Sequence, residues 1–386
     1  MMSFPKSLKN YKLISLAIAV IFTLSIFAAE DTQKLGPKAK RDLRSANMYL
    51  RQEIYDKAEP LYKSVIEENP LNVEALEKLA GIYYQVKKDY ITANEYYSKA
   101  LAAIDSIYTI HEDLKKQDEK QAEDFYDDNI DKYDLEDKQE TLGKLKNNCW
   151  LYIYKDALNY YKQQDFDTAI TKYKTLYQET PDSANVVQMI ANSYLQKQDN
   201  EKALEWLVKA AALKENDADL ASQIANLYVN QKKFEEAANW YEKAAVDEPE
   251  NPNHFYNMAV SYSNAKNYEK AYESYKKVIE LESDNLDAIM MANSLAVRLN
   301  KTEESIELLK KAADLDPNNI DVLSILSYQL FKQKDYEGVL NYAKKWYDVD
   351  NSAKEAVQLL YQSARNTNKP ELTKKYEQLY KSFEQE

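Results

Sequence analysis

The side chains that most often carry catalysis or bind metals are scarce in this chain. It has one cysteine, Cys149, and two histidines, His111 and His254, among 386 residues. One thiol and two imidazoles cannot supply the usual ligands of a zinc site. Cys149 has no histidine near it in sequence, so no nucleophile and base are paired, and we expect it to be a core residue or to lie at the edge of an insertion. We expect both histidines to be exposed and structural.

Carboxylates and glycines give no catalytic signal either. The chain has 64 Asp and Glu residues, so carboxylates that lie close together are expected without any acid–base role. Loops that hold phosphate groups need closely spaced glycines, and the four glycines of this chain never fall near one another. These glycines are Gly36, Gly81, Gly143 and Gly338. The sequence therefore predicts no catalytic residue, no cofactor and no metal site, and we expect a protein that is not an enzyme.

Composition and charge narrow the class of protein further. Four glycines are too few for the turns and bulges of a sheet-rich fold, so the composition favours helices. The net charge of −13 repels phosphate groups, which argues against a nucleic-acid partner.

The first 29 residues differ from the rest of the chain. Three lysines precede an uncharged run over residues 13–29, and acidic residues follow at once. This pattern is typical of an export signal, but cleavage after Ala28 would place Ile26 where a small residue is preferred. Residues 1–29 are therefore interpreted as a signal peptide or an uncleaved membrane anchor, followed by a linker over residues 30–38. We expect a periplasmic or secreted protein, or one anchored in the membrane with its folded part outside the cytoplasm.

A period of 34 residues organises most of the remaining chain. Short phrases such as Glu235-Glu236-Ala237 and Glu269-Lys270-Ala271 recur in strict phase. Each unit has two apolar stripes at helical spacing, and prolines follow several of the second stripes. The residues that end the phrases are Ala169, Ala203, Ala237, Ala271, Ser305 and Val339. Within the clearest unit the recurring residues are Ala225, Tyr228, Phe234, Ala237, Tyr241, Ala244 and Pro249.

This period and these residue types resemble the tetratricopeptide repeat (TPR) family. The resemblance implies an all-α fold, an alpha-alpha superhelix of about eight to nine helix-turn-helix repeats. Repeats 1 and 2 are predicted over residues 39–105 and six repeats over residues 150–353, with capping helices over residues 354–386. One period after Ala93 would end at residue 127, whereas the equivalent residue is Ala169, so about 42 residues are inserted.

The insertion, residues 106–149, is strongly acidic. Its middle, residues 127–134, is predicted to be a loop or a weakly ordered linker. We expect the preceding helix to be prolonged through residues 113–125 and the following helix to begin early, near residue 144. Asp127, Asn129 and Asp131 alternate as in a calcium loop, but lysines occupy the glycine and bidentate glutamate positions, so we expect no calcium site. A solvated charged segment and a partner-docking element remain as alternatives.

The resemblance also places the candidate binding residues. In this family the first helix of each repeat lines a concave surface that binds protein segments. An asparagine amide there offers both a donor and an acceptor to a peptide backbone, and tyrosines offer flat contact area. Ordinary surface residues would look the same. The candidate peptide-binding residues are Tyr154, Tyr161, Gln188, Asn192, Asn226, Tyr256, Tyr328 and Phe331.

Three functional hypotheses follow. The first is a non-catalytic scaffold that binds a protein or extended peptide in its concave groove outside the cytoplasm, with the acidic insertion as a second contact. The second is a membrane-tethered accessory subunit of an envelope assembly or secretion complex. The third is a module that accompanies a separate catalytic chain. The sequence does not identify the partner or the oligomeric state.

Overall fold

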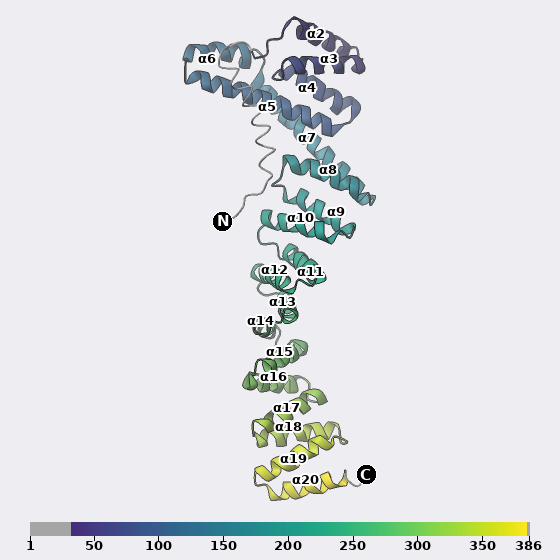
Figure 1. Ribbon diagram of the computed structural model, residues 1–386, viewed down its shortest axis with the longest axis vertical. Coiled ribbons are helices and arrows are strands. Elements are labelled where there is room, and N and C mark those ends of the chain that lie inside the picture. The colour runs from purple at the N-terminus through teal and green to yellow at the C-terminus, as the bar shows by residue number, and fades with distance from the viewer. Residues whose placement is uncertain (1–31, 384–386) are drawn as a thin grey trace. The chain divides into compact units, whose positions relative to one another are not determined.

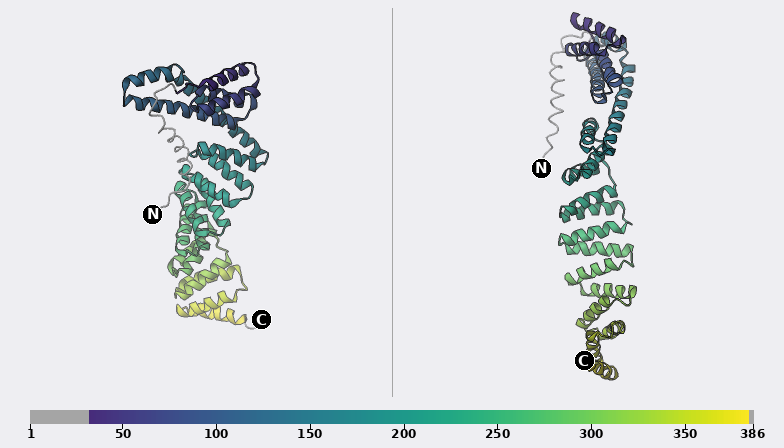
Figure 2. Two further views of the ribbon diagram at one scale, coloured as in Figure 1. Left: turned by 45° about the horizontal axis from the view of Figure 1, so that its top comes forward. Right: turned by 90° about the vertical axis from the view of Figure 1, so that its right-hand side faces the viewer.

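The computed structural model describes residues 32–383, so the predicted signal or anchor at residues 1–29 lies outside the described residues. The described chain contains α-helices and two π-helical turns but no strand, and within each part of the chain consecutive helices form antiparallel pairs (Figures 1 and 2). The prediction of an all-α stack of helix pairs is confirmed. The pairs are α2 (Pro37–Arg51) with α3 (Tyr55–Glu68), α4 (Val73–Gly81) with α5 (Tyr90–Lys115), α7 (Leu135–Lys162) with α8 (Phe166–Glu179), α11 (Ala218–Asn230) with α12 (Phe234–Asp247), α13 (Pro252–Asn264) with α14 (Tyr268–Leu281), α15 (Leu286–Arg298) with α16 (Thr302–Leu315), α17 (Ile320–Lys332) with α18 (Tyr336–Val349), and α19 (Lys354–Asn366) with α20 (Pro370–Ser382). Helices α9 (Ala184–Gln196) and α10 (Asn200–Leu213) lie between α8 and α11 in the sequence.

The chain divides into two compact units after Ser193, here called the N-terminal and the C-terminal unit. No helix among residues 32–383 combines the length and the apolar character needed to span a bilayer.

The turn between the two helices of a repeat has the same backbone in repeat after repeat. After α13, the N–H of Lys266 donates to the carbonyl of Ser263 and the N–H of Asn267 donates to that of Tyr262, at 3.0 and 2.9 Å. Lys266 itself is left-handed, with φ of 62°. This arrangement satisfies the last carbonyls of the helix, and glycine usually occupies the left-handed position. The equivalent left-handed residues, each 34 further along, are Gln164, Gln198, Lys232, Lys266, Asn300, Lys334 and Asn368. The scarcity of glycine therefore reflects turns built with other residues.

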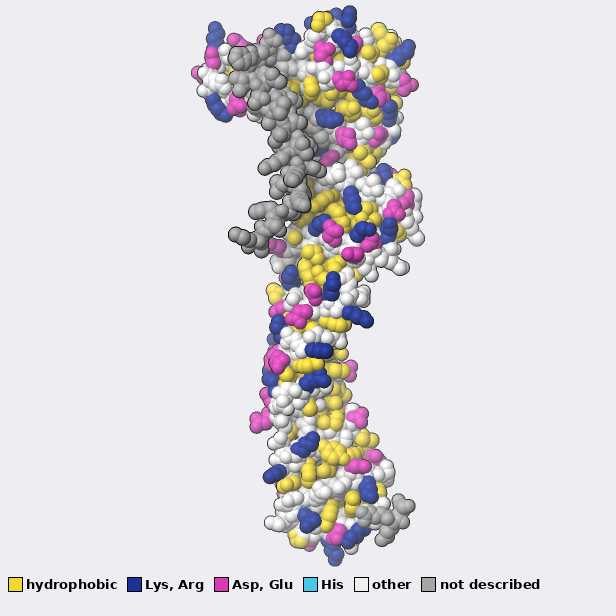
Figure 3. All heavy atoms as spheres, viewed as in Figure 1, with side chains coloured by type: hydrophobic (Ala, Val, Ile, Leu, Met, Phe, Trp, Pro, Cys, Tyr) yellow, Lys and Arg dark blue, Asp and Glu magenta, His cyan; other side chains and the backbone are white. Residues whose placement is uncertain are grey.

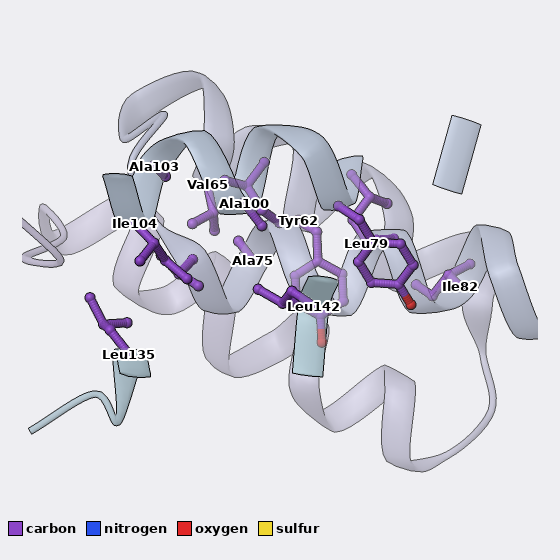
Figure 4. Packing of buried hydrophobic residues seen from close by; sticks show 14 of the residues in the cluster. Tyr62, Val65, Ala75, Leu79, Ile82, Ala100, Ala103, Ile104, Leu135 and Leu142 are labelled. Carbon is purple, nitrogen blue, oxygen red and sulfur yellow. The ribbon is translucent and has the colours of Figure 1, made fainter. Parts of the chain in front are cut away.

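Alanines and tyrosines fill the contacts between helices, as the period predicts. Ala225 and Ala259 are fully buried where helices approach closely, and Tyr241 and Tyr275 are each only 3% exposed. In the N-terminal unit the core also takes residues from the insertion. Figure 4 shows Leu135 of α7 and Ile104 of α5 in that core. The packing of small residues against large rings is what makes each repeat depend on its neighbours.

The second repeat has one residue more than the others, and the structure places it inside the first helix. The turn η1 (Ile82–Lys87) is π-helical, and the N–H of Asp89 donates to the carbonyl of Tyr83, one residue further back than in the other turns. The extra residue is thus taken up by widening the last helical turn.

The insertion is an ordered helical finger, a name used here for residues 106–149. Helix α6 (Glu119–Tyr126) folds back beside the end of α5 and leads through the turn η2 (Asp127–Asp131) into α7 (Figure 1). The prediction of a loop or linker over residues 127–134 is wrong for its first five residues, because Asn129 and Ile130 are buried. Charged residues around Ile130 hid this apolar anchor in the sequence. Helix α5 was expected to continue through residues 113–125 but ends at Lys115. Helix α7 was expected to begin near residue 144 but begins at Leu135.

A short strap, residues 32–35, connects the finger to the first two repeats. The backbone N–H and the hydroxyl of Thr32 both donate to Oδ1 of Asn129, which also donates from Nδ2 to the carbonyl of Phe125. The side chain of Gln33 accepts from the N–H of Val73 at 3.0 Å and donates to the carbonyl of Leu71 at 2.6 Å. The amide of Asn129 is therefore used by the protein itself.

Candidate functional site

The eight candidate binding residues all lie on first helices of their repeats. They fall on both sides of the boundary between the two units, so each unit is described by itself. Tyr154 and Tyr161 lie on α7, Gln188 and Asn192 on α9, Asn226 on α11, Tyr256 on α13, and Tyr328 and Phe331 on α17.

Two of the candidates secure turns between helices. The ring of Tyr161 meets Phe166 edge to face at 5.5 Å, and Phe331 meets Tyr336 in the same way at 5.7 Å. In each case the partner is the first residue of the second helix. These contacts fix the angle of the turn and account for both side chains without a ligand.

Two tyrosines are half-buried and share one geometry. Tyr154 packs edge to face on Tyr173 at 5.5 Å, and Tyr256 packs on Tyr275 at 5.5 Å. Tyr154 also stacks on Trp150 at 5.4 Å. One edge of each ring is therefore committed to the core while the remainder lies at the surface of the first helix.

The asparagines at equivalent positions differ in their surroundings. The hydroxyl of Tyr241 donates to Oδ1 of Asn226 at 2.5 Å, and Tyr62 donates to Asn47 in the same way at 2.6 Å. Asn192, at the equivalent position in the N-terminal unit, is half-buried. Asn226 is exposed, and its Nδ2 still has donors to offer a partner.

An exposed apolar row runs along the first helices of the C-terminal unit, and only part of it was predicted. Tyr328 is 42% exposed, Met291 48%, Ile325 37% and Val260 36%. These four residues, on α13, α15 and α17, are called the apolar row below. Met291 and Ile325 share one phase of the repeat and Val260 shares that of Tyr328, so the 34-residue period was the signal that could have found them. Figure 3 shows apolar side chains at the surface of the C-terminal helices.

The one cysteine and the two histidines, which were considered first as catalytic or metal-binding residues, are all buried. Cys149 is fully buried in the core, as predicted, and burial raises the pKa of its thiol to about 12. The prediction that both histidines are exposed is wrong, since His111 is 6% and His254 7% exposed. His254 lies 2.9 Å from Glu248 through Nε2 and 3.3 Å from Ser222 through Nδ1, so it ties the start of α13 to its neighbours. Among residues 32–383, no group of three or more His, Cys, Asp or Glu side chains could hold a metal ion.

Comparison with known families agrees with this architecture. Two tetratricopeptide repeat models match residues 43–106 and 160–226, and a model described as anaphase-promoting complex, cyclosome, subunit 3 matches residues 230–312. No curated protein matches the sequence.

Solved structures of repeat proteins show low similarity to this chain. MamA is 18% identical over 44% of this chain and 92% of its own, with a TM-score of 0.35. YrrB, described as a TPR protein with an unusual peptide-binding site, is 19% identical over 48% of this chain and 96% of its own, with a TM-score of 0.36. With repeat models matching in three separate parts of the sequence and helix pairs of matching period, the chain belongs to the tetratricopeptide repeat family.

Proposed function

We propose that this protein is a non-catalytic scaffold that binds a segment of another protein on the first helices of its C-terminal unit. The apolar row carries the proposal, because its side chains are exposed at matching phases of successive repeats. An apolar side chain that repeats in this way is available to a long partner segment at several points at once. Removing such surface from water is favourable by about 25 cal/mol per Å² of apolar area, before the costs of association are subtracted.

Polar groups beside the apolar row support binding of a polypeptide. Asn226 and Tyr256 lie on α11 and α13, the preceding part of the same series of first helices. An asparagine amide can pair with a peptide backbone, and a tyrosine ring gives contact area at a low cost in conformational entropy. Asn192, Gln188 and Tyr154 remain candidates for the same role in the N-terminal unit.

A scaffold role without catalysis is supported by what the reactive side chains do. Cys149 is a buried thiol whose pKa is raised, so it is a poor nucleophile at neutral pH. His254 is committed to Glu248 and Ser222. Both side chains are buried and serve the packing of the fold.

We also propose that the scaffold works outside the cytoplasm, directed there by residues 1–29. Their basic start and uncharged run support this location, either as a cleaved signal or as a tether to the membrane. Sequencing the N-terminus of the mature protein distinguishes the two. A start near Ala29 or Glu30 indicates a soluble protein, and an intact Met1 indicates the anchored form.

The binding proposal is tested by removing the apolar row while keeping the fold. Met291→Ser combined with Ile325→Ser is expected to leave thermal unfolding nearly unchanged, because both side chains are substantially exposed. A matched control is Val246→Ser with Leu315→Ser, two exposed residues of second helices.

The readout is affinity purification from the source cells with quantitative mass spectrometry. We expect at least one protein to be retained by the wild type and the control and lost by the Met291/Ile325 variant. Identical partner sets for all three proteins would contradict binding at the apolar row.

A further inference from the structure

The finger contains a cavity of about 430 Å³ between the end of α5 and α6. Two kinds of side chain line it. His111 and Tyr126 form its aromatic side, and three carboxylates of α6 and η2 line it with Lys115. The carboxylates are those of Glu119, Glu123 and Asp127.

His111 is buried in this cavity without a hydrogen bond from the described residues. It is 6% exposed, and its ring lies 5.2 Å from that of Tyr126. Oε1 of Glu112 lies 3.9 Å from its Nδ1, beyond hydrogen-bond reach. Burial, with a smaller effect of Lys115, lowers the pKa of His111, so the ring is neutral at pH 7. A neutral imidazole has one nitrogen that accepts a hydrogen bond, and His111 lines the cavity.

Several acids of the finger are paired with lysines, and among the described residues the cavity carboxylates are not. Glu112 pairs with Lys115 at 3.0 Å, Asp113 with Lys116 at 2.8 Å, and Glu140 with Lys144. Within residues 32–383, no ion pair or hydrogen bond is found for the side chains of Glu119, Glu123 or Asp127. Because Lys115 is held by Glu112, the cavity presents negative charge that the finger does not neutralise.

We propose that this cavity binds a cationic side chain, lysine or arginine, of a protein partner. The guanidinium or ammonium group lies against the ring of Tyr126, donates to the free nitrogen of His111 and is balanced by the three carboxylates. The described residues hold no cluster suited to a metal ion, and an organic cation fits the mixed aromatic and acidic lining. This site lies in the finger and does not depend on the apolar row of the C-terminal unit.

The two histidines make the inference directly measurable. In the full-length protein, NMR of the imidazole carbon-bound protons gives signals from His111 and His254 only, assigned with a His254→Gln variant. The probes are N-acetyl-arginine amide and Nα-acetyl-lysine amide, with N-acetyl-citrulline amide as the neutral analogue. We expect the cationic probes to shift the His111 signals in a saturable way and to leave His254 in place. Equal shifts with citrulline, or no shift of His111, would overturn the proposal.

Variants and a second cation sharpen the test. Glu123→Gln and Asp127→Asn are each expected to weaken binding of the arginine probe about two- to fivefold, the usual size of one partly exposed charge pair. Asp124→Asn, on the same helix but outside the cavity, is expected to leave it unchanged. Equal weakening by Asp124→Asn would show a general attraction to the acidic finger and would overturn the assigned site. Tighter binding of spermidine than of the arginine probe would overturn the assignment to a protein side chain.

Discussion

The regular repeats of the C-terminal unit and the irregular start of the N-terminal unit are held together in different ways. In the C-terminal unit, the turns after α11 and after α13 use the same backbone hydrogen bonds in the same phase. In the N-terminal unit, the strap, the finger and the π-helical turn each depend on side chains far apart in sequence. Examples are Thr32 with Asn129, and Glu59 with Lys87. A repeated turn is specified locally, whereas an interruption of the period requires long-range side-chain contacts.

The largest expected effect comes from a core ring of a regular repeat. Tyr241→Ala is expected to destabilise the C-terminal unit by about 3–5 kcal/mol, because the ring is 3% exposed and fills the space beside its repeat's alanines. Urea unfolding followed by circular dichroism measures the loss. Tyr241→Phe is the matched control and is expected to cost about 1 kcal/mol, because it removes only the hydrogen bond to the exposed Asn226. Equal losses of unfolding free energy for the two variants would mean that the hydroxyl of Tyr241, and not its ring, stabilises the packing of these helices.

The next effect is local and belongs to the finger. Asn129→Ala removes the acceptor of Thr32 and the donor to Phe125, and it is expected to cost about 2 kcal/mol in the N-terminal unit. Limited proteolysis should then cut near residues 32–35, while unfolding of the C-terminal unit stays unchanged. Asp128→Ala, an exposed neighbour, is the control and should leave the strap protected. Protection of the strap in Asn129→Ala would show that Gln33 alone is sufficient to hold it.

A pH dependence is expected at the π-helical turn. Burial alone would raise the pKa of Glu59, but hydrogen bonds from Lys63, Lys87 and Tyr83 lower it from 4.5 to about 2. Because the folded pKa is below the ordinary value, this carboxylate stabilises the fold above about pH 4.5, and the contribution is lost as the pH falls toward 2.

Glu59→Gln tests this expectation. At pH 7 the variant should lose about 1–2 kcal/mol of unfolding free energy, the scale of hydrogen bonds to a partly exposed charge. The difference between wild type and variant should shrink as the pH falls from 4.5 toward 2, measured by urea unfolding at each pH. A constant difference over that range would show that Glu59 acts through its shape and not through its charge.

The contrast between the units also explains how much of the structure could be predicted from the sequence. Residues that recur every 34 positions, such as Ala225 and Tyr241, predicted both the helix pairs and the core, because the same local pattern appears many times. Residues 127–131 were misread because Ile130 is their one apolar residue, and its burial depends on contacts distant in sequence. His254 was misread for the same reason, since its partner Ser222 belongs to the preceding repeat.

The candidate site was partly predictable, for a related physical reason. The position of each candidate within the 34-residue repeat placed all eight on first helices. That position does not reveal which residues each ring or amide contacts. Tyr161 and Phe331 pack against the following helix because an aromatic residue stands five positions later in both repeats. The apolar row could have been predicted by searching the first helices for apolar residues at positions where the repeat pattern does not require them.

The smallest expected effect concerns the repeated turn itself. Lys266 is left-handed, which costs a residue with a side chain about 1 kcal/mol or more, and glycine relieves that cost while adding flexibility to the unfolded chain. Lys266→Gly is therefore expected to stabilise the C-terminal unit by about 0.5–1 kcal/mol, measured as a shift of the urea midpoint. Lys310→Gly, the same change at an exposed position inside α16, is expected to destabilise it by a similar amount. Destabilisation by both variants would mean that the side chain of Lys266 supports the turn. Opposite signs would show that the backbone conformation alone defines the regular repeats, in contrast to the side-chain contacts that hold the finger.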